Sequence, residues 1–167
     1  LMATAAGLAR EGAQPFATTY AVFAARRAYD FICLAIAEER LDVKIVCALP
    51  GLTTGYGPSH QATEDTAIFR GMPGLTIVDP CDAHEILRGG NDVLVISSGL
   101  MTMRALEAAD LLRRDHVDVG VLHVPTIKPL DEEAILEAAG RSGRLVIVAE
   151  NHSLVGGLGE AVAGLLL

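Results

Sequence analysis

The 167-residue sequence has no tryptophan and few aromatic residues of any kind. Its apolar half consists mainly of alanine, valine, leucine and isoleucine, which can form a core and leave little room for disorder. No apolar run is long enough for a membrane span and no signal peptide is recognisable, so we expect a cytoplasmic protein. The few lysines and arginines are scattered, and the net charge is −8. This charge argues against nucleic acid or a membrane as a partner.

The three cysteines also lack a functional pattern. Cys33, Cys47 and Cys81 are odd in number and have no C-x-x-C spacing. Apolar residues surround the first two, so we expect small core residues in a reducing compartment.

Apolar periodicity predicts that strands and helices alternate along the chain. In the first half, strands are expected over residues 15–20, 43–48 and 75–80, with helices over 22–40 and 61–70 and Ser59 as a possible cap. In the second half, "DVLVISSG", "VDVGVLHV" and "RLVIVAE" have the continuous apolar character of parallel strands that are covered on both faces. Helices are expected over 102–114 and 131–139 and from 158 onward. The pattern predicts two parallel-sheet α/β domains.

The junction between the two halves is unusually short. Residues 81–86 supply barely more than one helical turn before the next strand, which is too little chain to cross a sheet. We therefore assign the domains to residues 1–86 and 87–167, and expect a missing segment between Ile86 and Leu87. Both ends fall inside predicted helices without a cap, so we also expect the sequence to be part of a longer protein.

Several motifs have ordinary structural explanations. "GPSHQ" lacks the second glycine of a hydrolase nucleophile turn, and His60 with Glu64 would need a third ligand to hold a metal. "GGLGEA" (156–161) lacks the third glycine of a dinucleotide fingerprint, so a turn that lets a helix approach a strand is favoured. "SSGLMT" (97–102) could bind an anion at a helix N-terminus, or use Ser98 as a plain cap. The other histidines have no visible partner and are expected to be structural or surface residues: His84, His116, His123 and His152.

The stretch "GLTTGYGPSHQATED" (51–65) has too little apolar surface to be core and places His60 near the expected start of a helix. Tyr20 and Phe23 lie at a strand-to-helix turn, where their rings could flank a flat ligand or simply plug the helix end. α/β sheets bind ligands beyond the carboxyl ends of their strands. These residues alone therefore predict a site for a polar, sugar-like or phosphorylated ligand, and favour an enzyme.

Three stretches resemble the C-terminal half of the transketolase family. They are "LMATAAGLAREGAQPFATTYAVFAARRAYD", "VKIVCALPGLTTGYGPSHQATEDTAIFRGMPGLTIVDPCDA" and "ENHSLVGGLGEAVA". The sequence is most similar to split transketolases, in which the pyrimidine-binding domain and the C-terminal domain form a separate subunit. Deoxyxylulose-phosphate synthase and the beta subunits of 2-oxo-acid dehydrogenases are relatives of this family.

The resemblance implies a transketolase subunit that uses thiamine diphosphate to move a two-carbon ketol unit between sugar phosphates. An N-terminal transketolase subunit would bind the diphosphate and its Mg²⁺, in a dimer of heterodimers, so no metal site is expected in this chain. Phe23 would stack on the aminopyrimidine and Tyr20 would line that pocket. His60 would be a hydrogen-bond donor or proton shuttle for the substrate, with Ser59 and Tyr56 beside it.

The sequence departs from the family pattern around the sugar site. Gly55 and Tyr56 occupy positions where many members have an acidic pair, and Ala48 and Leu49 occupy positions where members often have a histidine. The activating glutamate of the family would precede Leu1. Three alternatives therefore stay open: a deoxyxylulose-phosphate-synthase-like enzyme, a 2-oxo-acid dehydrogenase beta-type enzyme, and a non-catalytic regulatory module of the same fold.

Overall fold

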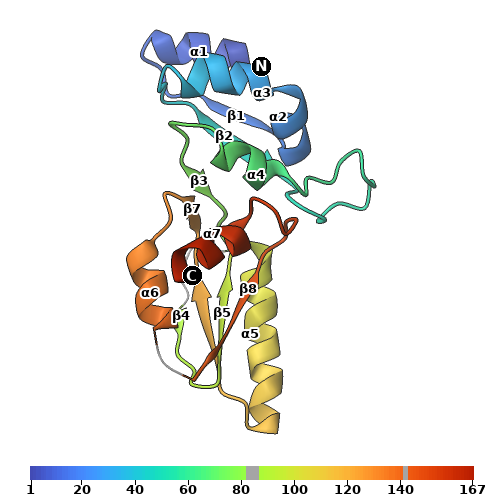
Figure 1. The fold of residues 1–167 in the computed structure, drawn as a ribbon. Coiled ribbons are helices and arrows are strands. Elements are labelled where there is room, and N and C mark those ends of the chain that lie inside the picture. The colour runs from blue at the N-terminus through green and yellow to red at the C-terminus, as the bar shows by residue number, and fades with distance from the viewer. Residues whose placement is uncertain (82–86, 141–142) are drawn as a thin grey trace. The chain divides into compact units, whose positions relative to one another are not determined.

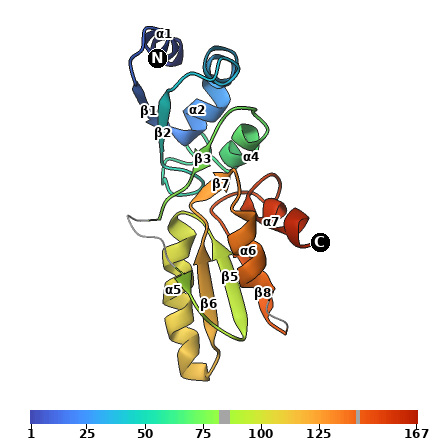
Figure 2. The ribbon, with the colours of Figure 1, turned by 90° about the vertical axis from the view of Figure 1, so that its left-hand side faces the viewer.

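The computed structural model describes residues 1–81, 87–140 and 143–167, and the chain forms two compact units, Leu1–Leu75 and Thr76–Leu167. Figures 1 and 2 show the ribbon from two sides. Three expectations fall on or beside residues outside these ranges, so they stay predictions. They are the short helical turn over residues 81–86, the domain boundary at 86/87 and the missing segment after Ile86. Within those ranges, no helix is long and apolar enough to cross a membrane.

The first unit contains the strands and helices that its sequence pattern predicts, with different boundaries. Its elements are α1 (Met2–Arg10), β1 (Phe16–Tyr20), α2 (Ala21–Arg27), α3 (Tyr29–Ile32), the π-helical turn η1 (Cys33–Ala37), β2 (Lys44–Ala48) and α4 (Asp65–Arg70). Strands β1 and β2 pair in parallel, from Phe16 opposite Lys44 to Tyr20 opposite Ala48. Two paired parallel strands agree with the expected α/β class.

The helix expected over residues 22–40 is not continuous. Helix α2 ends at Arg27, and the Ala28 N–H donates to the Phe23 carbonyl five residues earlier, at 3.2 Å. The Glu38 N–H donates in the same way to the Cys33 carbonyl, at 2.9 Å. These wide turns are π-type bulges, which add a residue to a helical turn. Apolar periodicity did not reveal them, because the core-facing positions continue on both sides of each bulge.

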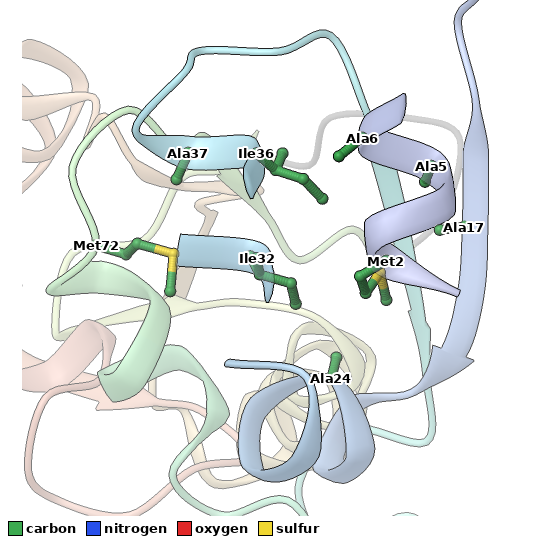
Figure 3. Close-up of a cluster of buried hydrophobic side chains, with 9 residues drawn as sticks. All are labelled: Met2, Ala5, Ala6, Ala17, Ala24, Ile32, Ile36, Ala37 and Met72. Carbon is green, nitrogen blue, oxygen red and sulfur yellow. The ribbon is translucent and has the colours of Figure 1, made fainter. Parts of the chain in front are cut away.

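Small side chains let the helices of the first unit pack closely around one core. Figure 3 shows the side chains of Met2, Ile32 and Ile36 gathered between α1, α3 and η1. Alanines supply most of the remaining buried contacts, and a dense core of this kind permits short distances between backbones. The apolar residues of α1 that point inward are thereby used within the unit, whereas Leu1 and Leu8 stay exposed.

Helix α4 begins four residues later than expected, and Ser59 does not cap it. The helix starts at Asp65, with Glu64 as its N-cap residue. Ala62 instead forms an isolated antiparallel bridge with Gly51, through N–H to carbonyl bonds of 2.9 and 3.0 Å. This bridge keeps the chain extended where the pattern predicted a first helical turn.

The second unit is a four-stranded sheet covered on both faces. Its strands run in the order β4 (Leu87–Arg88), β6 (Val119–His123), β5 (Val93–Ser97) and β8 (Leu145–Ala149), with β5 parallel to both of its neighbours and β4 antiparallel at the edge. Helix α5 (Leu100–Leu112), continued by the 3₁₀ turn η2 (Arg113–Asp115), covers one face (Figure 2). Helices α6 (Glu132–Ala139) and α7 (Leu158–Leu166) cover the other. The three strands expected here are confirmed as parallel.

The strand expected over residues 75–80 is much shorter in the structure. Strand β3 (Ile77–Val78) pairs antiparallel with β7 (Thr126–Lys128), with an irregular register between its two residues. Pro80 follows soon after and cannot donate a ladder hydrogen bond. The stretch therefore contributes to the second unit, and the described sheet of the first unit has two strands.

Candidate functional site

The predicted site residues lie at the carboxyl ends of β1 and β2. Tyr20 is the last residue of β1, and Phe23 lies in the first turn of α2. Because Tyr20 pairs with Ala48, the chain leaves both parallel strands at the same edge of the sheet. Figure 1 shows the long loop between β2 and α4, which carries His60. This edge is where α/β folds usually bind ligands.

Three aromatic rings surround the imidazole of His60. The ring centroids of Phe23, Tyr56 and Tyr20 lie 5.2, 5.3 and 5.9 Å from that of His60. Tyr20 and Phe23 also contact each other, with centroids 5.7 Å apart. Tilted and edge-on pairs at such distances are favourable for aromatic rings. Tyr20, Phe23 and His60 are half-buried, whereas Tyr56 is exposed.

Ser59 holds one nitrogen of the His60 ring. Its hydroxyl lies 2.9 Å from Nδ1 of His60, which makes a hydrogen bond in either tautomer. Within the described part of the chain, Nε2 of His60 has no hydrogen bond, and the residue as a whole is half-buried. All five residues predicted for the site, Tyr20, Phe23, Tyr56, Ser59 and His60, therefore come together.

Hydrogen bonds within the loop that carries His60 help to close it. Besides the Gly51–Ala62 bridge, the buried Thr54 accepts at its carbonyl from the Gln61 side chain, at 3.3 Å. The Thr54 hydroxyl accepts from the Tyr56 N–H, at 3.2 Å. Ala62, at the end of this segment, packs in one apolar cluster with Ala21 and Val22 of α2, so contacts to α2 also position the loop.

Two arginines of α2 were missed by the sequence reasoning and belong to this site. The guanidinium carbon of Arg27 lies 4.3 Å from the Phe23 ring centroid, a cation–π contact. Arg26 forms an ion pair with Glu64. Both arginines follow Phe23 by three or four residues, so helical spacing places them near its ring. That spacing was the signal that could have found them.

Glu64, which the sequence places one helical turn after His60, forms an ion pair with Arg26. The hydrogen bond from Arg26 holds the pKa of the Glu64 carboxyl below its usual value. Within the described ranges, no group of three or more histidine, cysteine, aspartate or glutamate side chains could hold a metal ion.

The half-buried Cys47 on β2 lies near the site and is not a reactive thiol. Burial raises the pKa of Cys47 to about 11, and the negative charge of Asp65 adds to the shift. The thiolate is the nucleophilic form, so Cys47 is inert at neutral pH.

In the second unit, side-chain carboxylates lie at the N-termini of α5 and α7, where the sequence suggested an anion or dinucleotide site. Gly99, not Ser98, is the N-cap residue of α5, and a Cβ at Gly99 would lie 2.5 Å from both carboxylate oxygens of Asp79. Burial raises the pKa of Asp79, an effect that the Ser98 hydroxyl and His123 oppose. The Glu150 carboxylate accepts from the first N–H groups of α7. "GGLGEA" is therefore a structural turn, and "SSGLMT" is closed by Asp79.

His123 has a structural environment. Its Nδ1 lies 2.9 Å from the Thr102 hydroxyl, which accepts from Ser97 at the same distance, and all three residues are buried. This network joins the ends of β5 and β6 to α5. It satisfies the polar groups that the sheet buries.

The fold defines a two-unit α/β protein, and the aromatic cluster around His60 is a candidate ligand site at the ends of its first two parallel strands. Two family models match the chain: the transketolase pyrimidine-binding domain over residues 1–89 and the transketolase C-terminal domain over residues 82–167. The chain belongs to the transketolase family. Its domains thereby imply dependence on thiamine diphosphate.

Two relatives and one solved structure show where the chain lies in this family. A transketolase family protein of Sinorhizobium fredii is 62% identical, covering 100% of this chain and 60% of its own length. A 6-deoxy-6-sulfo-D-fructose transketolase subunit of a Clostridium species is 35% identical, covering 98% and 63%. A split-gene transketolase solved as an inactive beta4 tetramer has a TM-score of 0.88 at 34% identity, covering 99% and 67%. The chain thus spans less than two thirds of these two relatives.

The match to the first relative also reveals a difference inside the aligned region. The alignment has 208 positions, whereas this chain has 167 residues, so the relative has at least 41 residues without a counterpart here. The two family models overlap at residues 82–89, which include the point where the sequence predicts a missing segment.

The residues at the site fit the aminopyrimidine end of thiamine diphosphate. Phe23 and Tyr20 offer half-buried aromatic surface beside each other, as a flat heterocycle requires. Arg27 covers part of the Phe23 ring, so a stacked ligand would use the opposite face. The described residues include no metal cluster for the diphosphate end.

Proposed function

We propose that this chain is the pyrimidine-binding subunit of a split transketolase that transfers a two-carbon ketol unit between sugar phosphates. One observation carries the proposal: His60 is held at the rings of Phe23, Tyr20 and Tyr56, and its Nε2 makes no hydrogen bond among the residues that the structure describes. Thiamine diphosphate, when bound, supplies the nucleophilic carbon that accepts the two-carbon unit. The residues of this chain then have to hold its pyrimidine, exclude water and handle protons on the sugar.

Each site residue has a role in that reaction. Phe23 stacks on the aminopyrimidine and Tyr20 closes the side of the pocket, which together exclude water. His60 uses Nε2 to donate a hydrogen bond to a substrate oxygen or to move its proton, because Ser59 engages Nδ1. Tyr56 lies on the exposed side of His60 and contacts the sugar.

A second polypeptide has to complete the active site. The diphosphate requires a divalent cation such as Mg²⁺, and we assign both to an N-terminal transketolase subunit, in a dimer of heterodimers. Two similarities support this assignment. The Clostridium relative is named as a transketolase subunit, and the split-gene structure of this type is an inactive tetramer.

Reconstitution tests the proposal. Mixed with its N-terminal subunit, thiamine diphosphate and Mg²⁺, the chain should transfer ketol units from a ketose phosphate, and alone it should not. His60→Ala should lower kcat about 100- to 10,000-fold, as loss of a general acid or base does, with cofactor affinity unchanged. His116→Asn is the matched control, because His116 is exposed at a left-handed position that asparagine tolerates.

The donor distinguishes the related activities. A deoxyxylulose-phosphate-synthase-type enzyme would consume a 2-oxo acid with release of CO₂ and ignore ketose donors. Turnover by the chain alone would refute the split-enzyme assignment. Full activity of His60→Ala would refute the role of His60.

A further inference from the structure

Arg26 contacts three points of the segment that carries His60. Its Nη1 donates to the Pro58 carbonyl at 3.2 Å, and its Nη2 donates to the Gln61 carbonyl at 3.2 Å. Its Nε forms the ion pair with Glu64. A guanidinium presents its donors in a rigid planar fork, so one side chain can serve three acceptors at once.

These contact points lie on both sides of His60. Pro58 precedes it by two residues and Gln61 follows it directly, so Arg26 holds the backbone before and after the imidazole. The same arginine lies on α2, one helical turn after Phe23. Arg26 thereby links the backbone that carries His60 to the helix that carries the ring it faces.

We infer that Arg26 is a positioning residue that fixes His60 over Phe23 and Tyr20. The inference rests on the proposed function in so far as His60 acts on the substrate. The other printed contacts of His60 are the Ser59 hydroxyl and the Gly57 carbonyl, both on the same loop, and the neighbouring aromatic rings. Neither kind of contact ties the backbone of the loop to α2 as Arg26 does.

The contribution of Arg26 is to geometry more than to stability. The side chains of Arg26 and Glu64 are 42% and 36% exposed, and ion pairs of such exposure contribute little to folding free energy. A displacement of a catalytic group by about 1 Å, however, can lower turnover about 100-fold. Removal of Arg26 therefore has a small effect on melting temperature and a large effect on kcat.

NMR of the full chain tests the position of His60 without any activity. The rings of Phe23, Tyr56 and Tyr20 shift the Hε1 resonance of His60, and Arg26→Gln should move it toward the value of a free histidine. Arg10→Gln is the matched control, since Arg10 forms a similar exposed ion pair with Glu39 in the same unit. An unchanged His60 resonance in Arg26→Gln would overturn the inference.

Kinetics of the reconstituted enzyme test the consequence. Arg26→Gln should lower kcat about 10- to 100-fold with unchanged cofactor affinity, and Arg26→Lys should not restore it, because an ammonium cannot reach three acceptors. The double variant Arg26→Gln/His60→Ala should be no slower than His60→Ala, because both changes remove the same contribution. A further loss in the double variant would show that Arg26 acts by another route. If the NMR shift moves but His60→Ala is fully active, the proposed function fails and the positioning stands.

Discussion

The Phe23 ring contacts the Arg27 guanidinium and the rings of Tyr20 and His60, which makes Phe23 the main candidate for cofactor contact. Phe23→Ala should weaken thiamine diphosphate binding by about 1–3 kcal/mol, the contribution of a buried, stacked aromatic ring. Calorimetric titration of the reconstituted complex measures this change. Phe31→Ala, at an exposed position on α3, provides the control and should leave the affinity unchanged. Equal affinities for both variants would contradict the stacking role.

The raised pKa of Cys47 predicts that the free energy of unfolding falls at alkaline pH. The thiol titrates near pH 8.5 in the unfolded chain and at about 11 in the folded one, so the unfolded state loses this proton first. The protonated Cys47 thiol contributes its full stabilisation of the folded state below about pH 8.5. This contribution is lost as the pH rises towards 11. The free energy of unfolding from urea titrations should therefore fall from pH 8 to pH 10.

Two alanine variants isolate this effect. Cys47→Ala should remove the part of the pH dependence that comes from the thiol, whereas Cys33→Ala should retain it. Identical pH profiles in both variants would show that other groups cause the loss of stability.

Helix α7 depends on a carboxylate from the end of β8. Glu150 accepts from the N–H groups of Leu158 and Gly159 at 2.6 and 2.8 Å, and a Cβ at Gly157 would lie 2.2 Å from its Oε2. Gly157→Ala should displace the carboxylate and lower the free energy of unfolding by about 1–2 kcal/mol, as the loss of a helix cap does.

Gly164, in the same helix, gives a control of opposite sign. No atom lies within 4 Å of a Cβ added there, so Gly164→Ala should raise the free energy of unfolding by about 0.5–1 kcal/mol. Urea titration of the two variants compares them directly. Shifts in the same direction would contradict the role of Glu150.

Across the whole molecule, the first unit has a sheet that is small for an independent domain. Its two strands leave Phe16 and Val46 largely exposed, at 72% and 48%. A sheet usually needs three or more strands to be stable by itself, and parallel sheets are normally covered by helices on both faces. The Sinorhizobium relative has at least 41 residues without a counterpart here, enough for a strand–helix–strand repeat.

Insertion of these additional residues of the relative between Ile86 and Leu87 should therefore stabilise the first unit. Hydrogen exchange of the β1 and β2 amides should slow by at least about tenfold, a gain of about 1.4 kcal/mol or more. A glycine- and serine-rich linker of equal length is the control and should have no effect. Equal protection in both insertions would mean that the segment does not complete this unit.

The amino-acid sequence by itself determined the alternation of strands and helices, the parallel strands of the second unit, and the candidates Tyr20, Phe23 and His60. These features depend on neighbours along the chain: apolar runs, helical spacing, and a polar loop after a strand. The π-type turn at Ala28 could not be predicted, because the core-facing periodicity continues through it.

Only the tertiary structure decided which distant groups meet. Arg26 reaches residues that are 32, 35 and 38 positions later in the chain, and no local pattern records such a pairing. The same holds for Asp79 beside Gly99 and for β3, whose partner β7 lies in the second unit. Ser59 shows both kinds of information. Its residue type predicted a side-chain hydrogen bond, but only the tertiary structure, with its Gly51–Ala62 bridge, showed that the partner is His60 and not a helix N-terminus.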